Sequence, residues 1–112
     1  MNEIASVKGA TGIIVVYEEC VMIQRDGFIG SIGNSIRKGN KTYNYDTIIG
    51  IDYRKPSLVA NGYIRILTAN SKSINNPQDL INDDDTVVIG YFSKKAREEA
   101  ENVYNILLGK VH

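Results

Sequence analysis

The chain has 112 residues, which is enough for one domain with its own hydrophobic core, and we expect a single domain over residues 1–112. Thirteen basic and thirteen acidic residues cancel, so no overall field draws the protein to nucleic acid or to anionic membranes. One cysteine excludes an internal disulfide, no apolar run reaches the roughly 18 residues of a membrane-spanning helix, and the N-terminus lacks a signal-peptide pattern. These features predict a cytoplasmic protein without a transmembrane segment.

The first third of the chain predicts short strands joined by turns. Residues 9–12 are expected to be a flexible lead-in. Residues 13–17 are apolar on both faces and rich in β-branched side chains, which indicates a strand covered on both sides. A turn at 18–19 leads to a second strand at 20–25. Residues 27–35 carry a glycine at every third position and fit either a loop or a distorted strand.

The middle of the chain predicts three more strands, at residues 42–45, 48–55 and 63–68. Pro56 ends the second of these, and Asn61 with Gly62 is a strong turn signal because both tolerate positive φ. Residues 70–85 are polar and rich in turn formers, and they predict no regular element. The acidic run Asp83–Asp85 within them is expected to be a solvated turn.

The last quarter of the chain predicts a buried strand at 86–92 that runs into a helix at about 93–108. Ser93 fits the N-cap, and Gly109 fits the position just past the end. The apolar residues recur at helical spacing and are expected to be buried: Ala96, Ala100, Val103, Tyr104, Leu107 and Leu108. Lys94 and Lys95 stand in the first turn, where the positive end of the helix dipole disfavours bases.

Six or seven short antiparallel strands followed by one helix predict a mainly β protein of the α+β class, either a barrel or a sandwich. The closing helix would then cover an open end or seam of the β-structure.

Several stretches carry a resemblance to a known family. Residues 7–18 and 21–28 resemble the opening of a bacterial family of pleckstrin-homology-like (PH-like) domains, which often precede a short SHOCT segment. Later pieces resemble the family as well: 41–43 before 48–51, the segment 61–66, and 86–88 running into 92–95. The resemblance implies a seven-stranded barrel of two orthogonal sheets capped by a C-terminal helix. It implies binding or scaffolding rather than catalysis, and it supplies no ligand.

The residues themselves argue against an enzyme, and we expect no catalytic residues, no cofactor and no metal. The one histidine, His112, is the last residue, and Cys20 has no internal histidine to activate it. Cys20 is expected to be a packed strand residue. The glycines at 27–35 match no phosphate-binding motif, and Asp83–Asp85 lack the spacing of a calcium loop.

Basic residues suggest one binding function. The candidate site for an anionic lipid headgroup or a phosphate consists of Arg37, Lys38, Lys41, Lys94 and Lys95. It requires the bases of the two segments to lie together. The first hairpin turns on two glutamates, Glu18 and Glu19, which would repel phosphate. Peripheral binding of anionic lipid is therefore the alternative hypothesis.

Tyrosines suggest the other function, which is the leading hypothesis. The candidate protein-contact patch consists of Tyr43, Tyr45 and Tyr53 on neighbouring strands, because tyrosine is favoured at protein interfaces. We expect a non-enzymatic PH-like module that binds a protein partner or a second copy of itself. Nucleic-acid binding ranks last, since Lys41 beside two tyrosines is its one hint.

Overall fold

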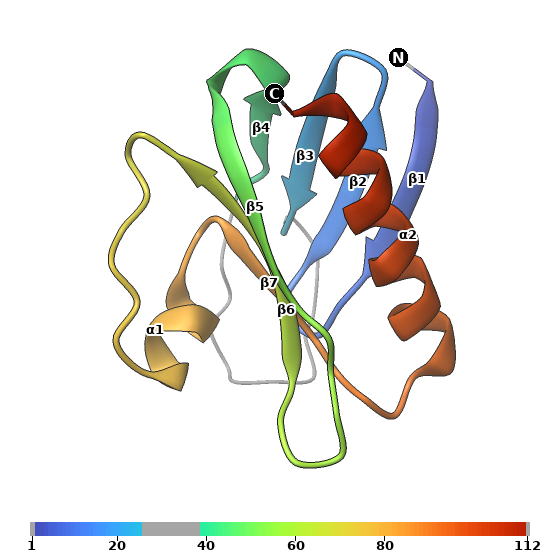
Figure 1. Cartoon of the computed structure of the whole chain (residues 1–112), viewed down its shortest axis with the longest axis vertical. Helices are drawn as coiled ribbons and strands as arrows, with labels where there is room; N and C mark the ends of the chain where they lie inside the picture. Colours follow the sequence, from blue (N-terminus) through green and yellow to red (C-terminus); the bar gives the residue numbers. More distant parts are fainter. Residues whose placement is uncertain (1, 26–38, 112) are drawn as a thin grey trace.

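The computed structural model describes residues 2–25 and 39–111, and these residues form two antiparallel sheets and a long C-terminal helix (Figure 1). The first sheet follows the chain order: β1 (Glu3–Lys8), β2 (Ile13–Tyr17), β3 (Cys20–Gln24) and β4 (Lys41–Asn44). A short 3-10 helix, η1 (Tyr45–Thr47), leads to the second sheet of β5 (Ile48–Arg54), β6 (Gly62–Thr68) and β7 (Thr86–Ile89). Helix α1 (Pro77–Asn82) precedes β7, and α2 (Lys94–Lys110) follows it.

The core lies between the two sheets and α2. Its fully buried side chains come from both sheets and from one face of the helix: Val7, Ile14, Val16, Val21, Ile23, Ile64, Ile66, Val87, Ile89, Ala100, Val103 and Leu107. The prediction that the apolar run 13–17 is covered on both faces is confirmed for the middle of β2, since Ile14, Val15 and Val16 are each at most 4% exposed. The coarse prediction of a mainly β chain with a closing helix is confirmed.

Helix α2 packs against β1 of the first sheet and against β5 and β7 of the second (Figure 1). Ser93 caps it as predicted, and its hydroxyl accepts a hydrogen bond from the Ala96 N–H at 3.1 Å. The helix continues to Lys110, so the prediction that Gly109 lies past its end was wrong. Leu107 is fully buried, but Leu108, about 100° further round the helix, is 47% exposed, so the prediction that Leu108 is buried was wrong.

Two strands differ from the sequence prediction. Residues 3–8 form β1, which was not predicted because Val7 is its one fully buried side chain and Ile4 is 40% exposed. Strand β7 ends at Ile89 rather than at Phe92. Ile89 pairs with Gly62, the first residue of β6, so residues 90–92 have no partner on that strand.

The stretch 70–85 contains one element that was not predicted, the six-residue helix α1. The Asn76 side chain caps it by accepting from the Asp79 N–H at 2.9 Å, and Pro77 occupies the first turn. This cap followed by proline is a recognisable start signal. The glycine-rich stretch 27–35 lies outside the described residues.

Candidate functional site

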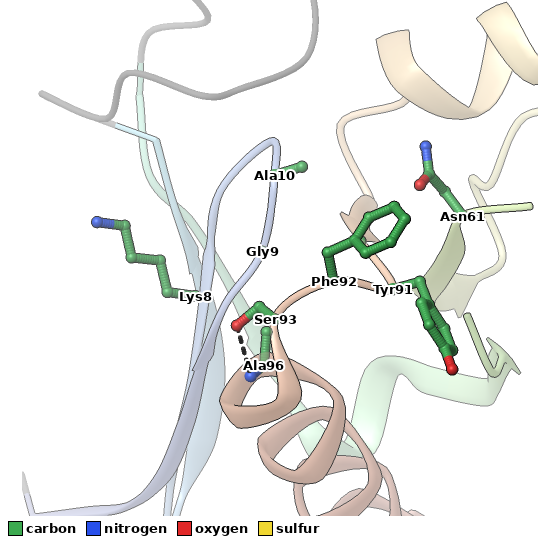
Figure 2. Close-up of a pocket in the computed structure, with 9 residues that line it drawn as sticks. Lys8, Gly9, Ala10, Asn61, Tyr91, Phe92, Ser93 and Ala96 are labelled. Atoms are coloured by element: carbon green, nitrogen blue, oxygen red, sulfur yellow. Dashed lines mark hydrogen bonds between the residues drawn. The ribbon is translucent and has the colours of Figure 1, made fainter. Parts of the chain in front are cut away.

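Three connections lie together at one end of the molecule, which we call the loop end (Figure 1). They are the β1–β2 connection (9–12), the β5–β6 connection (55–61) and the β7–α2 connection (90–93). A pocket of about 420 Å³ lies between them, and residues of all three line it (Figure 2). The first contributes Gly9 and Ala10, the second Asn61, and the third Tyr91, Phe92 and Ser93.

Two hydrogen bonds hold the β1–β2 connection against β7. The Ala10 N–H donates to the Val88 carbonyl at 2.7 Å, and the Val88 N–H donates to Thr11 Oγ1 at 3.1 Å. Gly9 approaches β7 so closely that a Cβ on it would lie 2.5 Å from the Val88 carbonyl oxygen. Only glycine fits there without a shift of the backbone, so this wall of the pocket is fixed by the fold.

The β7–α2 connection turns its two aromatic side chains in different directions. Tyr91 has the Arg97 guanidinium over its ring, 4.4 Å from the centroid. Phe92 extends toward Asn61 of the β5–β6 connection, as Figure 2 shows. The capping bond made by Ser93 fixes the start of α2 directly behind them. The chain therefore presents Phe92 outward while Tyr91 is held by the helix.

Large apolar side chains are exposed at the loop end. Val59 is 94% exposed, Phe92 is 88% exposed and Leu58 is 71% exposed, and these are the highest values for large apolar residues in the described part of the chain. A second, smaller groove beside α1 is lined by Val59 and Asn61, and Asn61 also lines the first pocket. Because Asn61 lines both hollows, the tip of the β5–β6 connection lies beside the β7–α2 connection that carries Phe92. Sequence reasoning marked 61–62 as a turn but did not predict this surface.

Bases surround these apolar tips. Arg54 and Lys55 precede the β5–β6 tip, Lys94 and Lys95 follow Phe92, and all four are exposed. Lys94 makes a loose pair with Glu98, 3.8 Å between Nζ and Oε1, with both side chains well exposed. Such a pair is worth at most about 1 kcal/mol, so it leaves the lysine able to change partners.

The anion site predicted from sequence combined Arg37, Lys38, Lys41, Lys94 and Lys95. Arg37 and Lys38 lie outside the described residues. Lys41 donates to Asp85 at 2.6 Å, just before β7 begins, whereas Lys94 and Lys95 stand beyond the end of β7. The structure therefore places Lys41 and the two helix lysines at opposite ends of that strand, and it does not bring them together.

The predicted tyrosine patch is largely turned inward. Tyr43 is 4% exposed, and its hydroxyl donates to Asp85 at 2.5 Å. The Tyr45 hydroxyl lies 2.6 Å from the Tyr17 carbonyl, and burial raises the pKa of Tyr45 to about 12. The ring of Tyr53 packs on Tyr104, 4.6 Å between centroids, and burial raises its pKa as well. Tyr43 is too buried to contribute to an exposed patch, and the other two are committed to internal contacts.

Buried charged residues join the two sheets and the 69–85 connection. Asp83 is 6% exposed and accepts from Arg65 Nε at 3.1 Å and from the Thr86 hydroxyl at 2.6 Å. Arg25, at the end of β3, donates to the Thr86 carbonyl at 2.5 Å. The prediction that Asp83–Asp85 form a solvated turn was therefore wrong for the first and last of them. Asp83 and Asp85 are both buried, and their partners (Arg65 for Asp83, Lys41 and Tyr43 for Asp85) lie far away in the sequence, so no local pattern could have shown the pairing.

Asp85 is the second carboxylate of this group. Burial alone raises the pKa of Asp85, but the hydrogen bonds from Lys41 and Tyr43 outweigh burial and hold that pKa below its usual value. The pKa of Tyr43 is raised, first by burial and then by the hydrogen bond to Asp85. Both carboxylates are thus engaged in hydrogen bonds that support the fold.

Within residues 2–25 and 39–111, no three His, Cys, Asp or Glu side chains gather in a way that could hold a metal ion. None of the described helices is long and apolar enough to cross a membrane. Comparison with family models, with curated proteins and with solved structures gives no match. The function must therefore be inferred from the geometry.

Proposed function

We propose that the chain is a cytoplasmic, non-enzymatic binding module built as a PH-like barrel. In such a barrel two sheets cross at a steep angle and a C-terminal helix closes one side. The order of four strands, three strands and a helix supports this architecture, as does the packing of α2 against strands of both sheets. The composition supports the compartment, since a chain with one cysteine has no disulfide of its own to form.

The side chains suited to proton transfer support a binding role rather than catalysis. The buried carboxylates Asp83 and Asp85 accept hydrogen bonds from Arg65, Lys41 and Tyr43, which leaves them inside the fold. The lining of the larger pocket carries no carboxylate, histidine or cysteine. Its ionisable groups are one lysine and one tyrosine, and that tyrosine lies against Arg97.

The observation that carries the proposal is the exposure of Val59, Phe92 and Leu58 on adjacent connections. Exposed apolar residues scattered singly are ordinary on a protein surface, whereas a cluster rimmed by polar residues marks an interaction site. The loop end combines such a cluster with a pocket and a rim of bases. We therefore assign the contact surface to the loop end rather than to the tyrosine-bearing strands.

A photo-crosslinking amino acid tests this assignment without knowledge of the partner. Benzoylphenylalanine is placed at Phe92 in one variant and at Ile49 in another, in cells that make the protein naturally. Ile49 is the matched control because it is also apolar and 69% exposed, at the start of β5 near the opposite end (Figure 1). Adducts with protein or lipid formed from position 92 and not from position 49 support the proposal. Equal yields from both positions would contradict it.

A second copy of the chain is one partner that this experiment also detects, since a crosslinked dimer has twice the mass of the monomer. Analytical ultracentrifugation of the purified protein then tells whether that contact persists in solution. A dimer that Phe92→Ser dissociates would identify self-association as the use of the loop end. A dimer unaffected by Phe92→Ser would place the self-contact elsewhere.

A further inference from the structure

The charges of the loop end are of one sign, although the whole chain is neutral. No acidic residue occurs in three stretches of the sequence, 4–17, 53–78 and 86–97, and these stretches contain the three connections. The exposed bases of these stretches are Lys72, between β6 and α1, and five that stand at or beside the three connections: Lys8, Arg54, Lys55, Lys94 and Lys95. The nearest acid along the chain is Asp52, two residues before Arg54; it is half-buried and accepts a hydrogen bond from the Tyr63 hydroxyl at 3.1 Å. Asp79 and Glu98 lie on α1 and α2.

The opposite end of the molecule carries acids. The β2–β3 turn consists of Glu18 and Glu19, and η1 contributes Asp46, and all three are exposed (Figure 1). Lys110 neutralises part of this negative charge, since its Nζ lies 3.0 Å from Glu18 Oε2. The folded molecule is thus neutral overall but has an acidic end and a basic end. The basic end is the loop end, which also bears the exposed apolar tips.

Helix α2 adds to the positive end instead of balancing it. Its first turn contains no acid and begins with Lys94 and Lys95, although the N-terminus of a helix already carries about half a positive charge. This arrangement is unfavourable for the helix itself. It is favourable for a helix start that faces an anionic surface, where dipole and lysines act in the same direction.

We infer that the loop end docks onto an anionic lipid surface. This inference rests on the proposed function, because it names the partner of the same contact surface. Val59, Phe92 and Leu58 enter the boundary between headgroups and acyl chains, where apolar side chains are stabilised by leaving water. The surrounding lysines and Arg54 remain at the level of the phosphates, and the acidic end points away from the membrane.

The shape of the loop end favours a lipid surface over a protein partner. The β5–β6 hairpin projects beyond the sheets, and its tip carries Leu58 and Val59 (Figure 1). A protein interface surrounds its apolar centre with a polar rim that pairs with specific partner groups. Here the charged residues that directly flank the three connections, Lys8, Arg54 and Lys94, are all basic, which suits a fluid surface of uniform negative charge. Each base near such a surface strengthens binding about fivefold, and the effect falls with added salt.

Vesicle sedimentation of the full chain tests the inference. The protein is mixed with vesicles of phosphatidylcholine alone and with vesicles that also contain phosphatidylglycerol. We expect binding that requires phosphatidylglycerol and weakens at high salt. Phe92→Ser should reduce the partition coefficient about tenfold, because it removes a large apolar side chain from the interface. Ile49→Ser, at an equally apolar position near the acidic end, should leave binding unchanged.

Each result has a definite meaning, because both exchanges alter exposed residues and circular dichroism verifies that the variants fold. Absence of binding to phosphatidylglycerol vesicles would overturn the inference. If position 92 then still forms protein adducts in cells, the loop end is a contact surface for a protein and the proposed function stands. If Phe92→Ser and Ile49→Ser weaken vesicle binding equally, the lipid contact is not made by the loop end and this inference fails, whereas crosslinking from position 92 still decides the proposed function.

Discussion

The Tyr43 hydroxyl donates to Asp85 Oδ1 at 2.5 Å, and this bond joins β4 of the first sheet to the residue that precedes β7 of the second. Lys41 donates to the same oxygen at 2.6 Å. The two donors differ in exposure, since Tyr43 is buried whereas the Lys41 side chain is 51% exposed. The tyrosine therefore makes the contact that is shielded from water and salt, and we expect it to contribute more to stability.

Tyr43→Phe tests that expectation. The exchange keeps the ring in the core and removes the hydroxyl, so it should lower the free energy of unfolding by about 1–2 kcal/mol. Lys41→Met removes the exposed partner and should cost less than about 1 kcal/mol. Urea unfolding followed by circular dichroism measures both. An equal or larger loss for Lys41→Met would show that the ion pair, not the buried hydroxyl, holds this contact.

The ionised form of Asp85 should stabilise the protein in a defined pH range. Its pKa is held below the usual value in the folded state, so the unfolded chain takes up a proton first as the pH falls. The stability that Asp85 provides is complete above the unfolded pKa of about 3.9 and is lost as the pH falls through the lower folded value. Unfolding free energies of the wild type and Asp85→Asn should therefore differ at pH 7 and converge below about pH 4.

Asp46→Asn is the control for that titration, because Asp46 is exposed in η1. It should change the unfolding free energy by less than about 0.5 kcal/mol. A difference between the wild type and Asp85→Asn that stays constant down to pH 3 would contradict the role of the ionised carboxylate.

Adjacent leucines near the end of α2 test how the helix packs. Leu107 is fully buried on the face of α2 that packs against the sheets, whereas Leu108 is 47% exposed. Leu107→Ala should lower the free energy of unfolding by about 2–5 kcal/mol, because it removes buried surface and leaves a cavity. Leu108→Ala should cost less than about 1 kcal/mol. Thermal unfolding of the pair gives the answer, and similar losses for both would mean that the packed face of α2 is assigned incorrectly.

Lys95 should have opposite effects on stability and on binding. Lys95→Gln removes a positive charge from the start of α2, so stability should stay the same or rise by a few tenths of a kcal/mol. Partitioning onto phosphatidylglycerol vesicles should nevertheless fall about fivefold. Thermal unfolding and vesicle sedimentation on the same sample separate the two effects. A variant that is both less stable and weaker in binding would indicate a structural lysine instead.

The sequence was informative where the pattern is local. The apolar run 13–17 predicted β2, and Ser93 with the spacing of Ala96, Ala100 and Val103 predicted α2. Strand β1 was not predicted, because only one of its side chains is fully buried and its position depends on pairing with β2. Helix α1 carried a usable signal in Asn76 and Pro77, but a polar segment of this kind is more often a loop.

The sites were harder to predict, because they depend on contacts between distant residues. Asp83 was expected in solvent and lies instead against Arg65. Tyr43 was expected at the surface, but the register of β4 with β3 turns it into the core. The apolar tips at Val59 and Phe92 could not be told from core residues by sequence, since only the fold shows that they protrude.

The most direct measurement uses the absence of tryptophan from the sequence. Phe92→Trp places a single fluorophore at the loop end, and Ile49→Trp places one near the opposite end at a similarly exposed apolar position. With phosphatidylglycerol vesicles, the emission of Phe92→Trp should shift to shorter wavelength and be quenched by lipids brominated near the headgroup, while Ile49→Trp stays unchanged. Emission from position 92 that does not respond to these vesicles, or an equal response from both positions, would contradict docking through the loop end.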